Sequence, residues 1–230
     1  LIEQEYDNYI VICINDCSTD KSWEILSSYN TNKKISGLTL DVNMGASNAR
    51  NIGIEIAEKA KCELIHFFDS DDIAYPTMIS DKVGFFDNQK VSVVYSDYYE
   101  GKNQETAEYV FKPWFDKDEL LSEGYIQCIS MTRTEDAMAV NTTLTYAEDW
   151  DLWTRILWEK IGVKISKPHF FYRNHECSLT RSLDKKAYSL DFAILRSKIL
   201  YKIGKIPIED VYLAYNNKRA YMEEKNNVKT

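Results

Sequence analysis

Three carboxylates within four positions follow an apolar run, and they are the first residues of this chain that suggest chemistry. Residues 64–68 are apolar except for His66, and Asp69, Asp71 and Asp72 come next. An apolar run of this length is typical of a strand buried on both faces of a parallel sheet. In open α/β sheets, ligands bind beyond the carboxyl ends of the strands, where these acids fall. Crowded carboxylates repel one another, and a hard divalent cation with oxygen ligands, bridging to a diphosphate, is the usual way to offset that repulsion.

Two other interpretations of the acidic cluster are open. A plain acidic turn at the surface explains an Asp-x-Asp sequence without any ligand. A calcium-binding EF-hand loop has a glycine after its third acidic position, whereas Ile73 and Ala74 follow here. The rest of the chain must decide between a metal site and a surface turn.

A second set of acidic residues lies in residues 148–158. On a helical wheel this segment has an apolar face, and Asp149 falls near the middle of it. Glu148, Asp151 and Arg155 fall on the other side, and the spacing of Asp151 and Arg155 predicts a surface ion pair. A carboxylate on a core-facing stripe is unfavourable without partners or a catalytic role, and a helix start helps to keep it ionised. Asp149 is therefore the candidate general base, with Glu148 second; the alternative is an acid that accepts backbone N–H groups at a helix start.

The elements that must position these residues follow a strand–helix–strand pattern. Apolar runs at residues 9–14, 37–41 and 64–68 predict three strands, and helical periodicity predicts a helix after each of the first two. This progression is typical of an α/β fold with a mostly parallel sheet flanked by helices. Asp16, which follows the first strand, is then expected at the same edge of the sheet as the acidic cluster. That placement favours a nucleotide or phosphate site over an acidic surface turn.

Composition excludes several classes of protein. The 230 residues are 44% hydrophobic and 13% aromatic, which indicates a globular chain. A net charge of −8 argues against a dedicated nucleic-acid-binding protein. No apolar run approaches the roughly 18 residues of a membrane span, and no signal peptide is visible. The five cysteines lack paired metal-binding spacing, so we expect reduced thiols and a cytoplasmic protein.

The C-terminal part of the chain has a different character. Helical periodicity predicts helices over residues 184–204 and from about 208 to 225. We therefore divide the chain into a main domain, residues 1–180, and a C-terminal helical extension, residues 181–230. Residues 181–205 hold seven Lys or Arg and two Asp or Glu, although the whole chain is acidic. A solvated helix face explains this bias; the alternative is a surface for an anionic acceptor or for peripheral membrane contact.

Three motifs together resemble the family 2 glycosyltransferases, which have the Rossmann-like GT-A fold. They are Asn-Asp-Cys-Ser-Thr-Asp at 15–20, Asn-Met-Gly-(x)2-Asn-Ala-Arg-Asn-Ile-Gly at 43–53, and Phe-Asp-Ser-Asp-Asp-Ile-(x)2-Pro at 68–76. The similarity extends to about residue 180. It implies an enzyme that moves a sugar from a nucleotide-sugar donor, most often a UDP-sugar, to an acceptor hydroxyl. The acceptor would be a glycan, a lipid-linked sugar or another hydroxyl compound.

The resemblance also implies a role for each residue of the donor site. Asp16 would hydrogen-bond the base of the nucleotide, and Asp69, with Ser70 beside it, would contact the ribose. Asp71 would ligate the Mn²⁺ or Mg²⁺ that holds the diphosphate. Arg50 would anchor the nucleotide, and an exposed helix arginine is the alternative.

Two later segments resemble parts of the same family. The Glu148-Asp149 pair resembles the base motif, in which the Asp removes the proton of the acceptor hydroxyl and the sugar configuration inverts in one displacement. Residues 172–178, Tyr-Arg-Asn-His-Glu-Cys-Ser, resemble the Arg-x-His-x-x-Ser motif, whose His can contact the metal or the diphosphate. His175 is therefore a candidate metal ligand, with a structural role as the alternative. His66 and His169 are interpreted as structural.

One feature of the family is missing from this sequence. Family members open with an apolar strand that ends in a Pro-x-Tyr-Asn turn and forms a wall of the nucleotide pocket, whereas this chain begins at Leu1 without one. Removing a central strand leaves backbone groups unpaired, so we expect such a strand upstream of Leu1. The alternative function is a non-catalytic nucleotide-sugar-binding module. A metal-dependent nucleotidyltransferase would need a Gly-rich, basic loop for a triphosphate, and none is visible.

Overall fold

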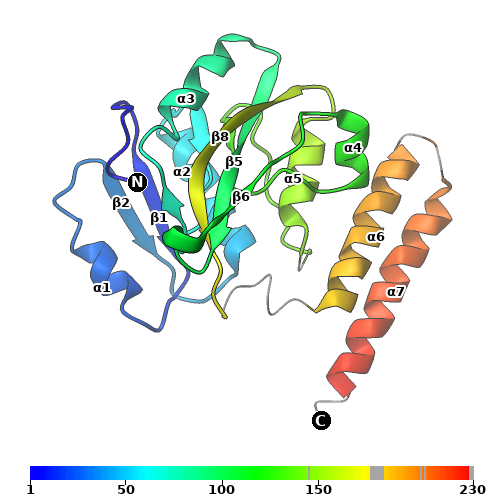
Figure 1. Ribbon diagram of the computed structural model, residues 1–230. Helices are drawn as coiled ribbons and strands as arrows, with labels where there is room; N and C mark the ends of the chain where they lie inside the picture. The colour runs from blue at the N-terminus through cyan, green and yellow to red at the C-terminus, as the bar shows by residue number, and fades with distance from the viewer. Residues whose placement is uncertain (145, 177–183, 203, 205, 228–230) are drawn as a thin grey trace.

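The computed structural model describes residues 1–144, 146–176, 184–202, 204 and 206–227. Figure 1 shows an α/β body with a pair of long helices at one side. The strands are β1 (Val11–Asn15), β2 (Ile35–Thr39), β3 (Leu64–His66), β4 (Ile73–Ala74), β5 (Val91–Gly101), β6 (Glu108–Val110), β7 (Met131–Arg133) and β8 (Ile161–Arg173). The helices are α1 (Ser22–Ser27), α2 (Ala46–Lys59), α3 (Ser80–Val83), η1 (Gly84–Asp87), η2 (Gln104–Thr106), α4 (Lys117–Ser122), α5 (Glu148–Ile156), α6 (Lys185–Lys202) and α7 (Ile208–Asn227).

The main sheet is mixed in direction. Its strands follow the order β3-β7-β5-β8-β4, and β6 pairs with β5. The predicted α/β class with flanking helices is confirmed, but a mostly parallel sheet was expected and only β5 and β8 pair in parallel here. The reason is the position of β7, which lies between β3 and β5 and runs antiparallel to both. Long strand β8 passes Pro168 at an irregularity of its ladder with β5, where the missing N–H of proline is tolerated.

Strands β1 and β2 form a separate parallel pair, with Val11 opposite Ile35 and Asn15 opposite Thr39. In the described chain neither strand pairs with the main sheet, and Figure 1 shows the pair beside α1 at one side of the body. Residues 11–14 are only half-buried, and Ile10 is exposed. The apolar run at residues 9–14 thus contains a strand, as expected, but β1 is half-buried, and within the described residues it pairs with β2 alone.

The main hydrophobic core surrounds α5. Trp150 and Trp153 are almost fully buried and pack with residues of β5 and α6. Trp150 stacks on Phe192 of α6 with ring centroids 4.1 Å apart. Burying large side chains contributes about 1.5–3 kcal/mol each, so the core fixes α5 firmly and with it the first turn that carries Glu148 and Asp149.

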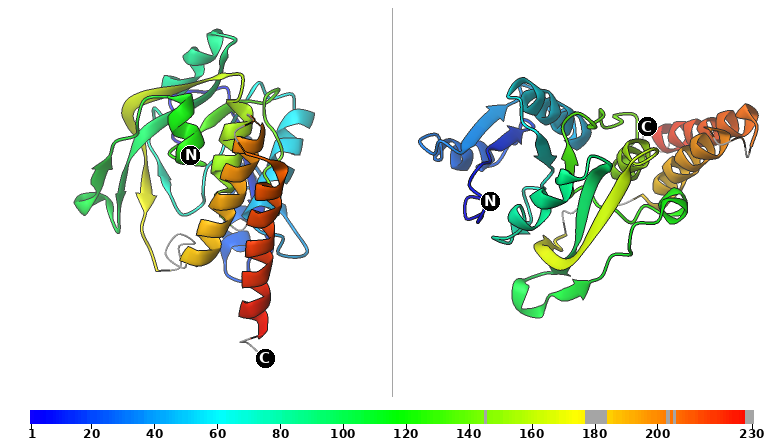
Figure 2. Two further views of the ribbon diagram at one scale, coloured as in Figure 1. Left: turned by 90° about the vertical axis from the view of Figure 1, so that its right-hand side faces the viewer. Right: turned by 90° about the horizontal axis from the view of Figure 1, so that it is seen from above.

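The two C-terminal helices pack against each other as a hairpin (Figures 1 and 2). Both agree with the predicted helices, and α6 buries Leu195 and Ile199 in the same core as α5. Residues 181–183, 203 and 205 of the basic segment lie outside the described part of the chain, as does the expected domain boundary after residue 180. In the part of the chain that the structure describes, no helix combines the length and apolarity needed to cross a bilayer.

Candidate active site

Arg50 joins the two acidic segments that the sequence singled out. From α2 it donates through Nη2 to Asp69 Oδ1 at 2.8 Å and through Nη1 to Glu148 Oε1 at 3.1 Å. Its side chain is only 16% exposed, which excludes an exposed helix arginine. Paired, hydrogen-bonded charges are the arrangement that partly buried ions require. One guanidinium thus holds the strand-end acids next to the first turn of α5.

Asp16 positions the start of α2. Its two carboxylate oxygens accept the backbone N–H groups of Met44 and Gly45, each at 2.7 Å. Gly45 has a φ of 85°, a conformation that favours glycine, and α2 begins directly after it. Each carboxylate oxygen has a second lone pair, so Asp16 keeps acceptor capacity for a ligand. The predicted contact with a nucleotide base remains a prediction.

The loop after β3 is attached to the end of β8. Asp71 Oδ2 lies 2.8 Å from His175 Nε2, and Asp72 Oδ1 accepts the backbone N–H of Arg173 at 2.9 Å. Ser70 is exposed beside them. Burial raises the pKa of Asp72 to about 7, against the lowering effect of the Arg173 N–H. The structure therefore brings together both candidate metal ligands. Ser178, the last residue of the histidine motif, lies outside the described residues.

The donor set of Asp71 and His175 fits a metal that is shared with a nucleotide. Among the described residues there is no group of three or more His, Cys, Asp or Glu side chains that could hold an ion alone. Mg²⁺ usually keeps several waters and binds through one or two protein carboxylates plus substrate phosphates. The two candidate ligands are half-exposed at the edge of the site, and the Asp71 carboxylate matches that mode.

Asp149 has the properties of a base in an active site. It is half-buried in the first turn of α5, and its Oδ1 accepts the N–H of Trp150 at 2.8 Å. Burial and, second, the neighbouring Glu148 raise the pKa of Asp149 to about 6, against the lowering effects of the Trp150 N–H and of Arg50. A carboxylate with a pKa near the working pH suits proton transfer. The alternative role for Asp149 was an acid that accepts backbone N–H groups at a helix start. Its bond to the Trp150 N–H is an interaction of that kind, so the alternative is met in part.

The other side of α5 differs from the expectation of a solvent-facing surface. Asp151 and Arg155 form the predicted ion pair at 2.8 Å, but Asp151 is 4% exposed, so the predicted surface location is wrong. Glu148, expected on that same outer side, instead bonds Arg50. The helical wheel could not show this, because α5 has neighbours on both sides and six of its nine residues are buried.

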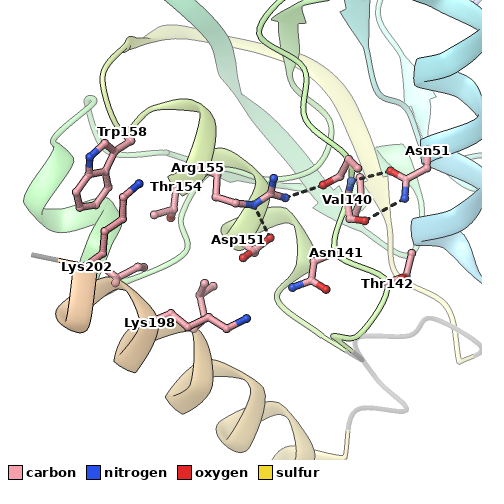
Figure 3. Close-up of a pocket in the computed structure, with 13 residues that line it drawn as sticks. Asn51, Val140, Asn141, Thr142, Asp151, Thr154, Arg155, Trp158, Lys198 and Lys202 are labelled. Carbon is pink, nitrogen blue, oxygen red and sulfur yellow. Dashed lines mark hydrogen bonds and ion pairs between the residues drawn. The ribbon is translucent and has the colours of Figure 1, made fainter. Parts of the chain in front are cut away.

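A cavity of about 610 Å³ lies on this second side of α5, between residues 139–142 and α6 (Figure 3). The side chain of Asn51 bonds both the N–H and the carbonyl of Val140, and Arg155 donates to Asp151 and to the carbonyl of Ala139. These bonds hold residues 139–142 against α2 and α5. None of the predicted site residues lines this cavity, so it is distinct from the candidate active site.

Lys112 is a residue at the site that the sequence did not identify. It lies in the segment between β6 and α4, and its Nζ stands 5.4 Å from the ring centroid of Tyr98. Burial lowers the pKa of Lys112, and the nearby carboxylates of Asp149, Glu100 and Glu123 oppose that shift. Residues 98–112 have a polar and aromatic sequence without a motif, so no sequence signal singled out Lys112.

Comparisons with known proteins agree with this geometry. The family model of glycosyl transferase family 2 matches residues 1–204. The chain is 29% identical over 209 residues to the UDP-Glc:alpha-D-GlcNAc-diphosphoundecaprenol beta-1,3-glucosyltransferase WfaP of Escherichia coli, covering 88% of this chain and 78% of that protein. It is 45% identical over 78 residues to the uncharacterized glycosyltransferase YibD of Escherichia coli K12, covering 34% of this chain and 22% of that one.

A solved structure shares the fold. Residues 1–349 of Staphylococcus aureus TarS in complex with UDP-GlcNAc match with a TM-score of 0.69 and 18% sequence identity. The match covers 86% of this chain and 60% of the TarS fragment. At this sequence identity, the structural similarity confirms the GT-A type of α/β fold. The chain spans about three-fifths of the TarS fragment.

Proposed function

This chain belongs to glycosyl transferase family 2, and from that membership we propose that it transfers a sugar from a UDP-sugar to an acceptor hydroxyl, with inversion and with a divalent metal. Two relatives support a UDP donor. The name of WfaP specifies UDP-Glc, and the TarS structure contains UDP-GlcNAc. The sugar of the donor is left open.

The observation that carries the proposal is the double ion pair of Arg50. It connects Asp69, at the end of β3, with Glu148, beside Asp149 in α5. A donor held at the β3 end would therefore lie next to the candidate base. Transfer needs this proximity, because orienting two reactants can supply several kcal/mol of the barrier.

The chemical step is a single displacement at the anomeric carbon. Asp149 accepts the proton of the acceptor hydroxyl as its oxygen bonds to the anomeric carbon. The bond from that carbon to the diphosphate oxygen breaks, and UDP leaves with the electron pair. Attack from the face opposite to the leaving group inverts the configuration. Arg50 donates to Glu148 at 3.1 Å, which holds that carboxylate in an ion pair beside Asp149.

Asp71 and His175 would hold the metal together with the diphosphate oxygens. A bound Mn²⁺ or Mg²⁺ would supply positive charge that stabilises the leaving diphosphate. The 2.8 Å contact of the two side chains supports this assignment, because both already point to one place. Ser70 and Asp69 would contact the nucleotide beside them, and Asp16 would read its base.

The proposed acceptors include a lipid-linked sugar, because the full name of the relative WfaP specifies an acceptor of that kind. Peripheral membrane contact through residues 181–205 is part of the same proposal. In the described part of this segment, Tyr188 and Tyr201 are exposed on a helix with lysines, a composition that suits anionic headgroups. Co-sedimentation with anionic vesicles, and none with neutral vesicles, is the expected result.

A non-catalytic nucleotide-sugar-binding module is the second candidate. The separate β1–β2 pair favours it, since a site built across two sheets is less firmly held. A screen of UDP-, GDP- and dTDP-sugars with and without Mn²⁺, scored for binding and for hydrolysis, separates the two. Metal-dependent binding with slow hydrolysis of one UDP-sugar is expected of the enzyme, whereas binding with no turnover of any donor or acceptor would favour the module.

A further inference from the structure

The cavity between α5 and α6 has the size and the apolar surface of a small-molecule site. Its volume is about 610 Å³, within the range of about 300–1,000 Å³ that is typical of such sites. The buried side chains of Val140, Leu195 and Ile199 line it, and the indole of Trp158 lies at one end (Figure 3). A ligand in this cavity would bind apart from the nucleotide-sugar donor, because none of the candidate active-site residues lines it.

Hydrogen bonds hold the wall of this cavity in place. The Asn51 side chain accepts the Val140 N–H at 2.6 Å and donates to the Val140 carbonyl at 3.0 Å. Arg155 donates to the Ala139 carbonyl at 2.7 Å and to the Asp151 carboxylate at 2.8 Å. The charges of Arg155 and Asp151 are therefore paired with each other, and the wall is fixed before any ligand arrives, as is usual for small-molecule sites.

Two lysines of α6 bring unpaired positive charge to the cavity. Lys198 and Lys202 both line it, and Figure 3 shows their side chains leaving α6 on the cavity side. Within the described chain neither forms an ion pair; Lys202 Nζ lies 4.4 Å from the ring centroid of Trp158, and Lys198 Nζ lies 5.2 Å from that of Tyr215. Like charges four positions apart on a helix repel each other, so a bound anion would offset that repulsion.

Asn141 adds an oriented N–H donor to the same cavity. Its Oδ1 accepts the backbone N–H of Thr143 at 3.0 Å and the hydroxyl of Thr143 at 2.7 Å. These two bonds fix the orientation of the amide, and its Nδ2 group has no acceptor among the residues that the structure describes. Two ammonium groups and an amide N–H form a donor set that suits the oxygens of an anion.

We propose that this cavity is a second binding site, and that it takes the phosphate group of an organic phosphate. A phosphate monoester carries a charge of about −1.5 to −2 at pH 7, which matches the two unpaired lysines. Residues four apart on a helix have Cβ atoms about 5–6 Å apart, so the flexible side chains of Lys198 and Lys202 can reach one phosphate. The organic part packs on Trp158 and on the apolar wall.

The inference does not depend on sugar transfer, because the cavity and the candidate active site share no residue. Phosphate groups of this kind occur on soluble sugar phosphates and on lipid phosphates, and both offer the same oxygens. The test therefore uses both sources, in buffer with EDTA so that no metal assists binding at the donor site. The probes are inorganic phosphate, a hexose 1-phosphate with the free hexose as its neutral control, and phosphatidylcholine vesicles with and without phosphatidic acid.

The variants separate the cavity from the general charge of α6. Lys198→Gln with Lys202→Gln removes both cavity lysines. Lys185→Gln with Arg196→Gln removes two exposed positive charges from the same helix outside the cavity, and it is the matched control. Asn141→Asp keeps the Oδ1 acceptor for Thr143 but replaces the amide donor with a negatively charged oxygen. Calorimetry measures the soluble probes, co-sedimentation measures the vesicles, and a melting curve shows whether each variant is folded.

We expect the wild type to bind the hexose phosphate or the phosphatidic acid vesicles more tightly than inorganic phosphate, and to leave the neutral controls unbound. The double cavity-lysine variant and Asn141→Asp should each weaken that binding by about 10- to 100-fold, whereas the control variant should match the wild type. The probe that binds identifies the source of the phosphate. If one cavity variant unfolds, the other decides. No binding of any probe by the wild type, no loss in the folded cavity variants, or equal losses in the cavity and control variants would each overturn the inference.

Discussion

Oδ2 of Asp71 lies 2.8 Å from Nε2 of His175, although 104 positions separate the two residues in the chain. The contact joins the loop after β3 to the end of β8, and it brings together two side chains that suit a divalent metal. The remaining ligands would be oxygens of the donor and of water, so metal affinity and nucleotide affinity should depend on each other.

That dependence gives a prediction for Asp71. Asp71→Asn should weaken Mn²⁺-dependent binding of UDP by at least about tenfold, because a charged ligand is lost, without unfolding the protein. Titration calorimetry with and without Mn²⁺ measures the effect. Asp87→Asn, at an exposed position, is the control. Equal UDP affinity in the Asp71 variant and the wild type would remove Asp71 from the site.

Arg50 should matter for stability as well as for the site. Arg50→Ala leaves Asp69 and Glu148 partly buried without their shared cation, so we expect a loss of about 1–3 kcal/mol in the free energy of unfolding. Adding Glu148→Gln removes one of the two uncompensated charges and should recover part of the loss. A double-mutant cycle by urea unfolding gives the coupling between Arg50 and Glu148, and additive effects would mean that the ion pair contributes nothing.

Asp16 should affect which nucleotide binds. Asp16→Ala removes the proposed acceptor for the imide N–H of uracil and also the two bonds to the N–H groups of Met44 and Gly45. We expect the preference for UDP over CDP to fall, as measured by competition against a fluorescent UDP analogue. Asp20→Ala, at an exposed position four residues after Asp16, is the control. Unchanged selectivity would show that other residues read the base.

The pKa of Asp149 predicts an acid limb in the rate. A general base must be deprotonated, and burial raises the pKa of Asp149 to about 6. The value of kcat/KM should therefore fall about tenfold per pH unit below about pH 6 and level off above it. A profile measured from pH 4.5 to 8 checks this, and a limb centred near pH 4 would mean that Asp149 is solvated in the working enzyme.

The acidic cluster and the Glu148-Asp149 pair could be predicted from the sequence because each lies in a short segment with a strong pattern. The contact of Arg50 with Glu148 could not, since it spans 98 positions and depends on how α2 meets α5. The burial of Asp151 was missed for a related reason, because the pattern of α5 does not show that a second helix covers its polar side. Lys112 carried no signal at all.

The central claim is that Asp149 takes the proton of the acceptor, and Asp149→Asn tests it most directly. The substitution keeps the shape of the side chain but removes the carboxylate. The pKa of Asp149 is raised on folding, so its ionised carboxylate lowers the stability of the folded protein above about pH 6. At pH 7.5 the variant should therefore melt at the same or a higher temperature. The account predicts a fall of about 10²–10⁴-fold in the transfer rate, with UDP affinity unchanged and the acid limb absent. Transfer at the wild-type rate would contradict the account and leave Glu148 as the next candidate for the base.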